Sequence, residues 1–506
     1  MRRTDLGGNM KTLIKFAVII NMAFWITGAA GPAFGQNEPA GYSISTPRPI
    51  NPAASTTNPS ALATQGQNPY LGSTPVGKVT DQEVSLSLQE AVERGLRYNL
   101  GLIESSQATA EVRAERLRAL SSLLPNVSAK GEQAFEDLSL QEIGLRLPPT
   151  PGVRPLPTTT GAFSYQDARV SLEQSVYSQE LHDRFRAQKS AEQASQFTTR
   201  DARDVVVYAV GVAYLQVVAS AARVETARAE LASARELDQQ TADQLKNEVS
   251  PEIDALRAQV ERQSAEQRLI NATNAFEKDK LALGRIIGIP IDQKVTLTYT
   301  AQYHPLADFT QQAATAEALE SRSDLRSAEE SVRAAEYAVR GEKAQRLPAL
   351  SVHASYGGAG TNVGSFNSVY TVAGTISFPL YTGGRIRADV DEARATLARR
   401  QAEYADLKGR VAYDVRVAWL DLEASDSGVK VADRNRALAD RALTQSRDRY
   451  SNGVTNYLEV VEAEEVLTAA EENYIQTLYS FNVSKIALAR AMGVAERRFS
   501  DFFGRE

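Results

Sequence analysis

The chain has 506 residues, carries a formal net charge of −6, contains no cysteine and has a mean hydropathy of −0.32. Without cysteine it cannot form disulfides, thiolate metal sites or a cysteine nucleophile. Its mild acidity argues against a nucleic-acid partner, which requires concentrated basic surface, and the negative hydropathy excludes a bundle of transmembrane helices.

The N-terminal segment has the three parts of a secretory signal. Arginines and lysines precede an apolar run, Phe16–Ile26, and small residues follow up to Gly35. The run is shorter than the roughly 20 residues of a membrane-spanning helix, so we assign residues 1–35 to a signal peptide and expect export. We expect no later stretch to be apolar enough to span a membrane as a helix. Residues 36–80, rich in proline, serine and asparagine, are predicted to be a disordered leader.

One long pattern occurs twice in the chain. Tyr208 recurs as Tyr413, an offset of 205 positions, whereas the Leu-Pro pair at Leu124 recurs at Leu347 with an offset of 223. The first copy therefore carries an insertion, and neither copy is expected to bury its surface alone. We predict a first repeat over 81–290, an inter-repeat linker over 291–311, a second repeat over 312–495 and a C-terminal tail over 496–506.

The first repeat begins with a capping-box pattern at Ser87, which predicts a helix to about Ser121. Strands are predicted near Val127–Phe135 and Ala168–Leu172, with a long proline-rich loop between them. No proline occurs from Gln179 to the turn near Ser250, so one helix is predicted there. At a rise of 1.5 Å per residue, about 70 residues would span roughly 105 Å.

The second repeat is predicted to follow the same order. A helix is expected from about Ala313 to Gln345, followed by strands over Leu350–Tyr356 and Tyr370–Leu380. The loop between these strands is placed at Gly358–Ser368. Pro379 is the last proline of the chain, so a second very long helix is expected after it.

The predicted strands alternate apolar and polar residues, which fits two architectures. A transmembrane barrel has lipid on one face and water on the other, whereas a soluble sandwich buries one face. Export and the very long helices favour the barrel. Because bilayer barrels begin at about eight strands, the four strands of one chain must combine with those of other chains. Three copies would supply twelve strands, although a dimer would also close a barrel.

Short turns near 247–251 and 451–455 are predicted to reverse each long helix. Each repeat would then contain an antiparallel helical hairpin whose helices pack side by side along their length. A soluble coiled coil would also explain these helices, but it would not explain the strand hairpins.

Four patterns follow one another in order along the chain: Leu86–Val92 with Asn99, Leu347–Ser351, Phe378–Arg385, and Gly453 followed by Tyr457–Ala463. Together they resemble the TolC-like outer membrane efflux protein family, over about residues 82–495. The resemblance implies a mixed α and β membrane fold: a homotrimer with a twelve-stranded outer membrane β-barrel, continued by a periplasmic α-helical tunnel. It also implies docking to a periplasmic adaptor (membrane fusion) protein and to an inner membrane pump or ABC exporter.

The same resemblance implies a periplasmic gate. Glu459 and Glu462 lie three residues apart on one helix face and match positions where family members place acidic rings, which favour cations. The alternative is an ordinary solvated helix face. Asp254 and Tyr450 match the family's closing network, and Tyr450 would bond to Asp254 if the two hairpins touch. Some members have an arginine where this chain has a threonine after the glycine. The expected adaptor contacts are Val249, Ser250, Pro251, Gly453, Val454 and Thr455.

We find no pattern that predicts catalysis, a cofactor or a metal site. His182, His304 and His353 are scattered without ligand spacing, and the glycines of 357–360 lie between strand candidates rather than before a helix. We therefore expect no enzyme but the exit duct of a tripartite efflux pump or type I secretion system. Its place would be the outer membrane of a Gram-negative-type envelope.

Two other classes of protein were weighed against the duct. A periplasmic coiled-coil adaptor of a secretion or efflux machine is the alternative, although adaptors usually carry one helical hairpin. A general porin would need many more strands per chain and no long helices. The sequence does not specify the cargo.

Overall fold

The computed structural model of the chain describes residues 68–139, 158–248, 251–299, 303–305 and 310–503. The predicted signal peptide and residues 36–67 of the predicted leader lie outside these ranges. The chain divides into two units, Met1–Ser60 and Ala61–Glu506, and every element below belongs to the second.

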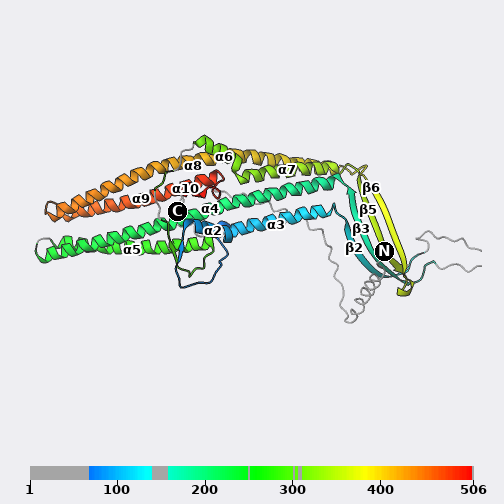
Figure 1. Cartoon of the computed structure of the whole chain (residues 1–506), viewed down its shortest axis with the longest axis horizontal. Coiled ribbons are helices and arrows are strands. Elements are labelled where there is room, and N and C mark those ends of the chain that lie inside the picture. The colour runs from blue at the N-terminus through cyan, green and yellow to red at the C-terminus, as the bar shows by residue number, and fades with distance from the viewer. Residues whose placement is uncertain (1–67, 140–157, 249–250, 300–302, 306–309, 504–506) are drawn as a thin grey trace, which may run out of the picture. The chain divides into compact units, whose positions relative to one another are not determined.

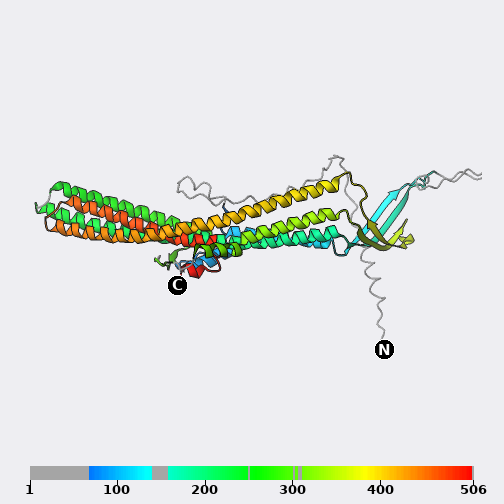
Figure 2. The same cartoon turned by 90° about the horizontal axis from the view of Figure 1, so that it is seen from above.

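Both repeats have the same order of elements, as predicted (Figures 1 and 2). The first contains α2 (Leu88–Tyr98), α3 (Leu100–Ser121), β2 (Asn126–Glu136), β3 (Phe163–Tyr177), α4 (Gln179–Lys246) and α5 (Glu252–Ile287). The second contains α6 (Gln311–Ser321), α7 (Ser323–Ala344), β5 (Ala349–Gly360), β6 (Asn367–Ser377), α8 (Arg385–Ser451) and α9 (Tyr457–Ala491). Short elements are η4 (Pro69–Leu71), β1 (Val84–Leu86), β4 (Val295–Leu297), η5 (Val363–Ser365) and α10 (Phe499–Phe503).

The first helix of each repeat is interrupted, so the predictions of single helices to about Ser121 and over Ala313–Gln345 were wrong. The breaks fall at Asn99 and Arg322, 223 positions apart, where both residues are extended with ψ of 131° and 122°. Asn99 is wholly buried, and its side chain accepts a hydrogen bond from Gly101 N at 3.0 Å. A capping side chain thus replaces the helical backbone bond at that point. The capping box predicted at Ser87 is confirmed.

Residues 68–80, which we assigned to the disordered leader, make contacts with the first repeat and with the segment that follows it. The ring of Tyr70 lies so close to Gly101 that a Cβ there would be 2.5 Å from it. Thr80 N donates to Gln293 Oε1 at 2.9 Å. Tyr70 therefore anchors the segment by filling space over α3 that only glycine leaves open.

The predicted linker contains a strand. β4 pairs in parallel with β1, with Val84 opposite Val295 and Leu86 opposite Leu297. The predicted C-terminal tail also packs back, since Phe502 is only 3% exposed.

The main hydrophobic core is centred on the middle of α4. Val206, Val210 and Tyr214 are fully buried there, and Tyr214 Oη donates to Leu86 O at 2.9 Å. Among the described residues, α4 is also the one helix long and apolar enough to span a membrane, and half of that stretch is buried within the protein. Our expectation that no such stretch follows the signal peptide was therefore wrong: a core helix with an apolar central face passes the same test.

The other strands form one antiparallel sheet in the order β2-β3-β5-β6. Each strand hairpin starts just after a proline that follows α3 or α7, so the sheet adjoins one end of those helices (Figure 1). The predicted loop Gly358–Ser368 is shorter than expected, because β5 extends to Gly360 and β6 begins at Asn367. The glycines of 357–360 therefore lie within β5.

The packing of α2 on α4 predicts the effect of filling one glycine. A Cβ added at Gly95 would lie 2.5 Å from Val210 Cγ2. We expect Gly95→Ala to lower the melting temperature, because overpacking costs about 1–3 kcal/mol and exceeds the gain of about 1 kcal/mol in helix propensity. Gly409→Ala is the control, since its Cβ meets nothing within 4 Å, and it should leave stability unchanged or raise it. Equal melting temperatures for the two variants would contradict this packing.

Candidate channel wall and helical tips

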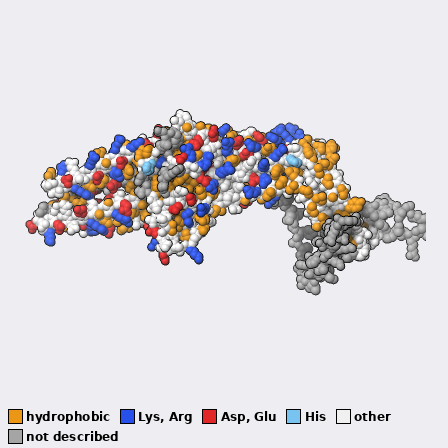
Figure 3. Space-filling view, viewed as in Figure 1, with side chains coloured by type: hydrophobic (Ala, Val, Ile, Leu, Met, Phe, Trp, Pro, Cys, Tyr) orange, Lys and Arg blue, Asp and Glu red, His pale blue; other side chains and the backbone are white. Residues whose placement is uncertain are grey.

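The register of the four-stranded sheet gathers apolar side chains on one face. Residues in one cross-strand row share a face because side chains alternate along each strand. On β6, Tyr370, Val372 and Ile376 are 78%, 73% and 69% exposed. Figure 3 shows hydrophobic side chains crowded over the strands, whereas charged side chains are frequent over the helices. Two neighbouring rows on this face are Val127–Leu172–Ala354–Val372 and Ala129–Val170–Tyr356–Tyr370.

The opposite face of the sheet is polar and carries charges. One row there is Ser128–Ser171–Ser355–Thr371. Asp167 lies 2.6 Å from Arg169 and accepts a hydrogen bond from Tyr165 Oη at 2.8 Å. The sheet therefore separates an apolar surface from one that water can solvate.

Two long edges of the sheet have no partner strand within the described part of the chain. They belong to β2 and β6, the outer strands, each of 11 residues. An exposed edge of this length next to an apolar face is a template for pairing with another chain.

The helical hairpins end in short exposed turns. Gly453 supplies a left-handed residue, with φ of 69°, between α8 and α9, and Val454 beside it is 67% exposed. Asn456 caps α9, its Oδ1 accepting from Glu459 N at 3.3 Å. Pro251 is exposed at the start of α5. Val249 and Ser250 lie outside the described residues.

The two predicted gate carboxylates differ in their surroundings. Glu459 is half-buried, accepts a hydrogen bond from Thr455 Oγ1 and lies 3.6 Å from Arg449 Nε. Glu462, one turn further along α9, is exposed. Arg449 brings a cation to this turn from α8.

Polar bonds tie the two hairpins together near the tips. Tyr450 Oη, on α8, donates to Gln244 Oε1 of α4 at 2.8 Å. Further from the tip, Arg447 donates to Glu464 Oε1 at 2.7 Å, and both bond to Ser233 of α4.

Between these bonds lies a small apolar cluster around Tyr457, which is 1% exposed. Tyr450 therefore joins the hairpins, with Gln244 as a partner. Asp254, in the first turn of α5, lies 3.7 Å from Arg257.

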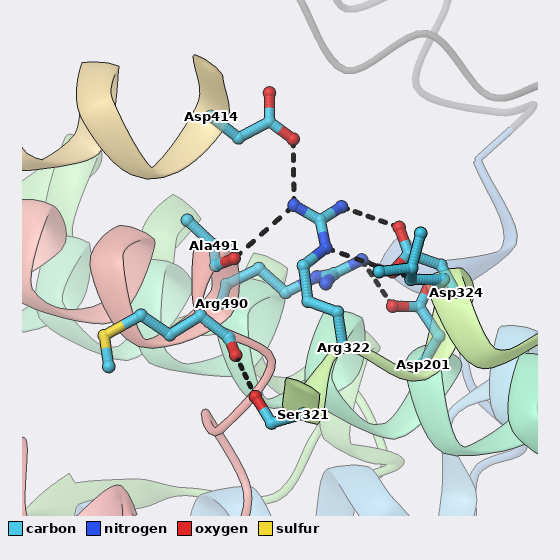
Figure 4. Close-up of polar contacts among 9 residues, drawn as sticks. Asp201, Ser321, Arg322, Asp324, Asp414, Arg490 and Ala491 are labelled. Carbon is cyan, nitrogen blue, oxygen red and sulfur yellow. Dashed lines mark hydrogen bonds and ion pairs between the residues drawn. The ribbon is translucent and has the colours of Figure 1, made fainter. Parts of the chain in front are cut away.

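A buried cluster of charges joins the two repeats where α6 ends (Figure 4). Arg322, only 6% exposed, donates twice to Asp324, at 3.0 and 2.6 Å, and once to Asp414 of α8 at 3.0 Å. It also reaches Ala491 O at 3.4 Å, at the end of α9. Arg490 in turn lies 2.9 Å from Asp201 of α4.

Burial and charge act against each other in this cluster. Burial of Asp324 favours its neutral form, but the hydrogen bonds and the charge of Arg322 outweigh it, so the pKa of Asp324 is lowered. Burial raises the pKa of Asp201, and the charge of Arg490 opposes that change. Arg322 therefore favours the charged form of Asp324 inside the protein.

Sequence reasoning missed the charged residues that join the hairpins and the repeats. Arg322 had one signal, its position 223 residues after Asn99, which marks both as helix breaks. No pattern in the sequence indicated that Arg447 and Ser233 bond to each other, because they meet only through the packing of α8 on α4.

Comparisons with known proteins agree with this geometry. Residues 314–494 match the family model described as outer membrane efflux protein. The chain is 27% identical over 244 residues to the outer membrane efflux protein BepC of Brucella suis, covering 47% of this chain and 52% of that protein. It is 23% identical over 333 residues to the alkaline protease secretion protein AprF of Pseudomonas aeruginosa, covering 65% and 69%. The first of these alignments thus spans about half of the relative's length.

The fold is that of solved outer membrane channels. The Campylobacter jejuni CmeC outer membrane channel superposes with a TM-score of 0.69 at 17% identity, over 88% of this chain and 94% of that one. The VceC outer membrane protein of Vibrio cholerae gives a TM-score of 0.67 at 18% identity, over 80% and 96%. Part of the second repeat thus matches the outer membrane efflux protein model, and the chain as a whole is similar in sequence to an outer membrane efflux protein and in fold to outer membrane channels.

The buried charge cluster predicts a graded response to substitution of Arg322. Arg322→Met would leave Asp324 and Asp414 without their shared cation, and removing one partner of a buried pair costs about 3–5 kcal/mol. Arg322→Lys keeps the charge but not the forked geometry, so it should lower the melting temperature less. The control is Arg387→Met on α8, whose side chain is 84% exposed. A melting temperature for Arg322→Met equal to that of the control would show that the cluster contributes no stability.

Proposed function

We propose that this chain is one subunit of an outer membrane exit duct, serving a tripartite efflux pump or a type I secretion system. The observation that carries the proposal is the two-faced, four-stranded sheet with two open edges, joined to helices of 68 and 67 residues. The apolar face suits lipid and the polar face suits a water-filled lumen. The duct performs no reaction of its own, and a partner supplies the energy for transport.

The proposed assembly is a homotrimer. Three copies would place β6 of one subunit beside β2 of the next and close a twelve-stranded barrel without edges. The strands have 11 to 15 residues, enough for the roughly 9–11 residues that a tilted strand needs to cross a bilayer.

The helices would carry the lumen through the periplasm. α4 has 68 residues, a length of about 102 Å at 1.5 Å per residue. The exposed tips at Pro251, Gly453, Val454 and Thr455, with Val249 and Ser250, are the proposed contacts for a periplasmic adaptor, which would connect the duct to an inner membrane pump or ABC exporter. The relatives' names include both efflux and protease secretion, and we leave the cargo open.

The proposed gate lies at the same end of the duct. In a trimer, Glu459 and Glu462 would each form a ring of three carboxylates, and Tyr450 and Asp254 would belong to the bonds that hold the hairpins closed. The bonds of Tyr450 to Gln244 and of Arg447 and Glu464 to Ser233 support this proposal, because they hold α8 and α9 against α4 near the tips.

Disulfide cross-linking tests the closure of the barrel. Because the chain contains no cysteine, only the introduced pair can form a disulfide. Ser128→Cys on β2 is combined in turn with cysteine at Val369, Thr371 or Ala373 on β6. Oxidation in outer membranes should give a covalent trimer for the pair that faces across the subunit boundary, since a disulfide needs Cα atoms within about 7 Å.

The matched control is Ser171→Cys with Thr371→Cys, because β3 is enclosed by strands of its own chain and should give no trimer. A product that stops at the dimer, or a ladder beyond the trimer, would contradict the three-fold closure.

Neutralising the proposed gate should change conduction. Glu459→Gln combined with Glu462→Gln removes six charges from a trimer, so cation selectivity in planar bilayers should fall or single-channel conductance should change. Glu403→Gln with Asp406→Asn removes as many charges from exposed positions on α8 and should alter neither property as strongly. Unchanged conductance and selectivity in the first variant would remove both residues from the gate.

A further inference from the structure

A cavity of about 480 Å³ lies between α4 and α9, beside the segment that contains β4. It exists because α4 presents small side chains there, Ala219, Ala221 and Ala222, which do not reach across to α9. Leu215 and Leu478 form part of its apolar wall. Its volume falls within the range of about 300–1,000 Å³ that is usual for small-molecule sites.

One wall of the cavity carries a buried polar group without a partner. Asn482 of α9 is 0% exposed, and its Nδ2 donates to Leu478 O at 3.0 Å. Because that carbonyl oxygen can only accept, the orientation of the amide is fixed and Oδ1 is left as the second polar atom. Oδ1 is buried and has no hydrogen-bond partner in the described part of the chain.

An unsatisfied buried acceptor is costly. Leaving such a group without a hydrogen bond costs about 1–3 kcal/mol, and native proteins contain few of them. Leucine would fill nearly the same space on α9 at no such cost. An asparagine that lines a cavity with its acceptor free is therefore better explained by a donor that enters the cavity than by packing.

The cavity becomes more polar toward the helical tips. Glu471, half-buried and 11 residues before Asn482, lines it there, about 16 Å away along α9. Burial raises the pKa of Glu471, which indicates a poorly hydrated surrounding. Arg436 lies over the ring of Tyr474 at 4.2 Å, and Tyr479 and Tyr299 add further aromatic surface.

We propose that this cavity binds a small, mainly apolar molecule that carries an N–H or O–H donor, with Asn482 Oδ1 accepting the hydrogen bond. Aromatic amines and aromatic alcohols fit this description, because the walls are aliphatic and aromatic and offer one deep acceptor. The site lies within the wall of the helical body of one chain, built from both repeats, and its occupation does not depend on the proposed role as a duct.

The experiment uses N-phenyl-1-naphthylamine, an apolar amine with one N–H donor that fluoresces in apolar surroundings. It is titrated into the full-length protein in an amphipathic polymer free of detergent, and the signal of the polymer alone is subtracted. Wild type should show one saturable site per chain. Ala222→Leu, which fills the cavity, should abolish it.

Asn482→Leu should weaken binding about five- to tenfold, the effect of losing one hydrogen bond. The matched control is Asn473→Leu, the same substitution at an exposed position of the same helix, and it should bind as wild type does. Wild-type binding by both Ala222→Leu and Asn482→Leu, or no saturable site in wild type, would overturn the proposal.

Thermal unfolding separates a binding role for Asn482 from a structural one. Without the probe, Asn482→Leu should melt at or above the temperature of wild type, because it removes an unsatisfied acceptor. Addition of the probe should raise the melting temperature of wild type more than that of the variant. A large fall in the melting temperature of the variant without the probe would assign Asn482 a structural role and contradict the proposal.

Discussion

The hydrogen-bonding groups along the edges of β2 and β6 are the constraint on which the proposed architecture depends. In hydrocarbon, an unpaired backbone N–H or C=O group costs several kcal/mol, so a sheet can lie in a bilayer only if it closes. The four strands of one chain leave two edges of 11 residues. Their register also puts Tyr370 and Val372 on an apolar surface that water would not favour. Closure with further copies satisfies the edges and the apolar face together.

The helical body faces a different constraint, since two repeats must be held in one alignment over a long distance. Apolar packing alone permits helices to slide past one another. Arg490 connects the repeats at one level, because it lies 2.9 Å from Asp201 of α4. Beside it, Arg322 joins Asp324, Asp414 of α8 and the end of α9 within the second repeat. Arg447 and Ser233 make a second connection nearer the tips. The polar bonds thus define the register, and the apolar core around Tyr214 provides most of the burial.

Small residues on α4 have two opposite effects along its contact with α9. At Gly211 the helices approach so closely that a Cβ would lie 2.6 Å from Ile486 Cδ1. About two turns further on, Ala219 and Ala222 face side chains that do not close the gap, and the cavity beside Asn482 results. The close contact at Gly211 sets the distance between α4 and α9. At that distance, the small side chains of Ala219 and Ala222 leave the space that forms the cavity.

The sequence alone determined the duplication, the order of the elements and the two-faced strands. These properties follow from local periodicity, from prolines such as Pro379 and from the capping box at Ser87. It did not determine the helix breaks at Asn99 and Arg322, because both side chains are buried and make bonds to distant parts of the chain, Asn99 to Tyr70 O and Arg322 to Asp414. The packing of Tyr70 on α3 was also not predicted, because the composition around this residue is typical of a disordered segment. Only the tertiary structure decided that Tyr450 meets Gln244, that Arg322 joins four helices and that Asn482 lines a cavity. Each of these depends on contacts between residues far apart in the sequence, or on the space left between helices, and no local pattern encodes them.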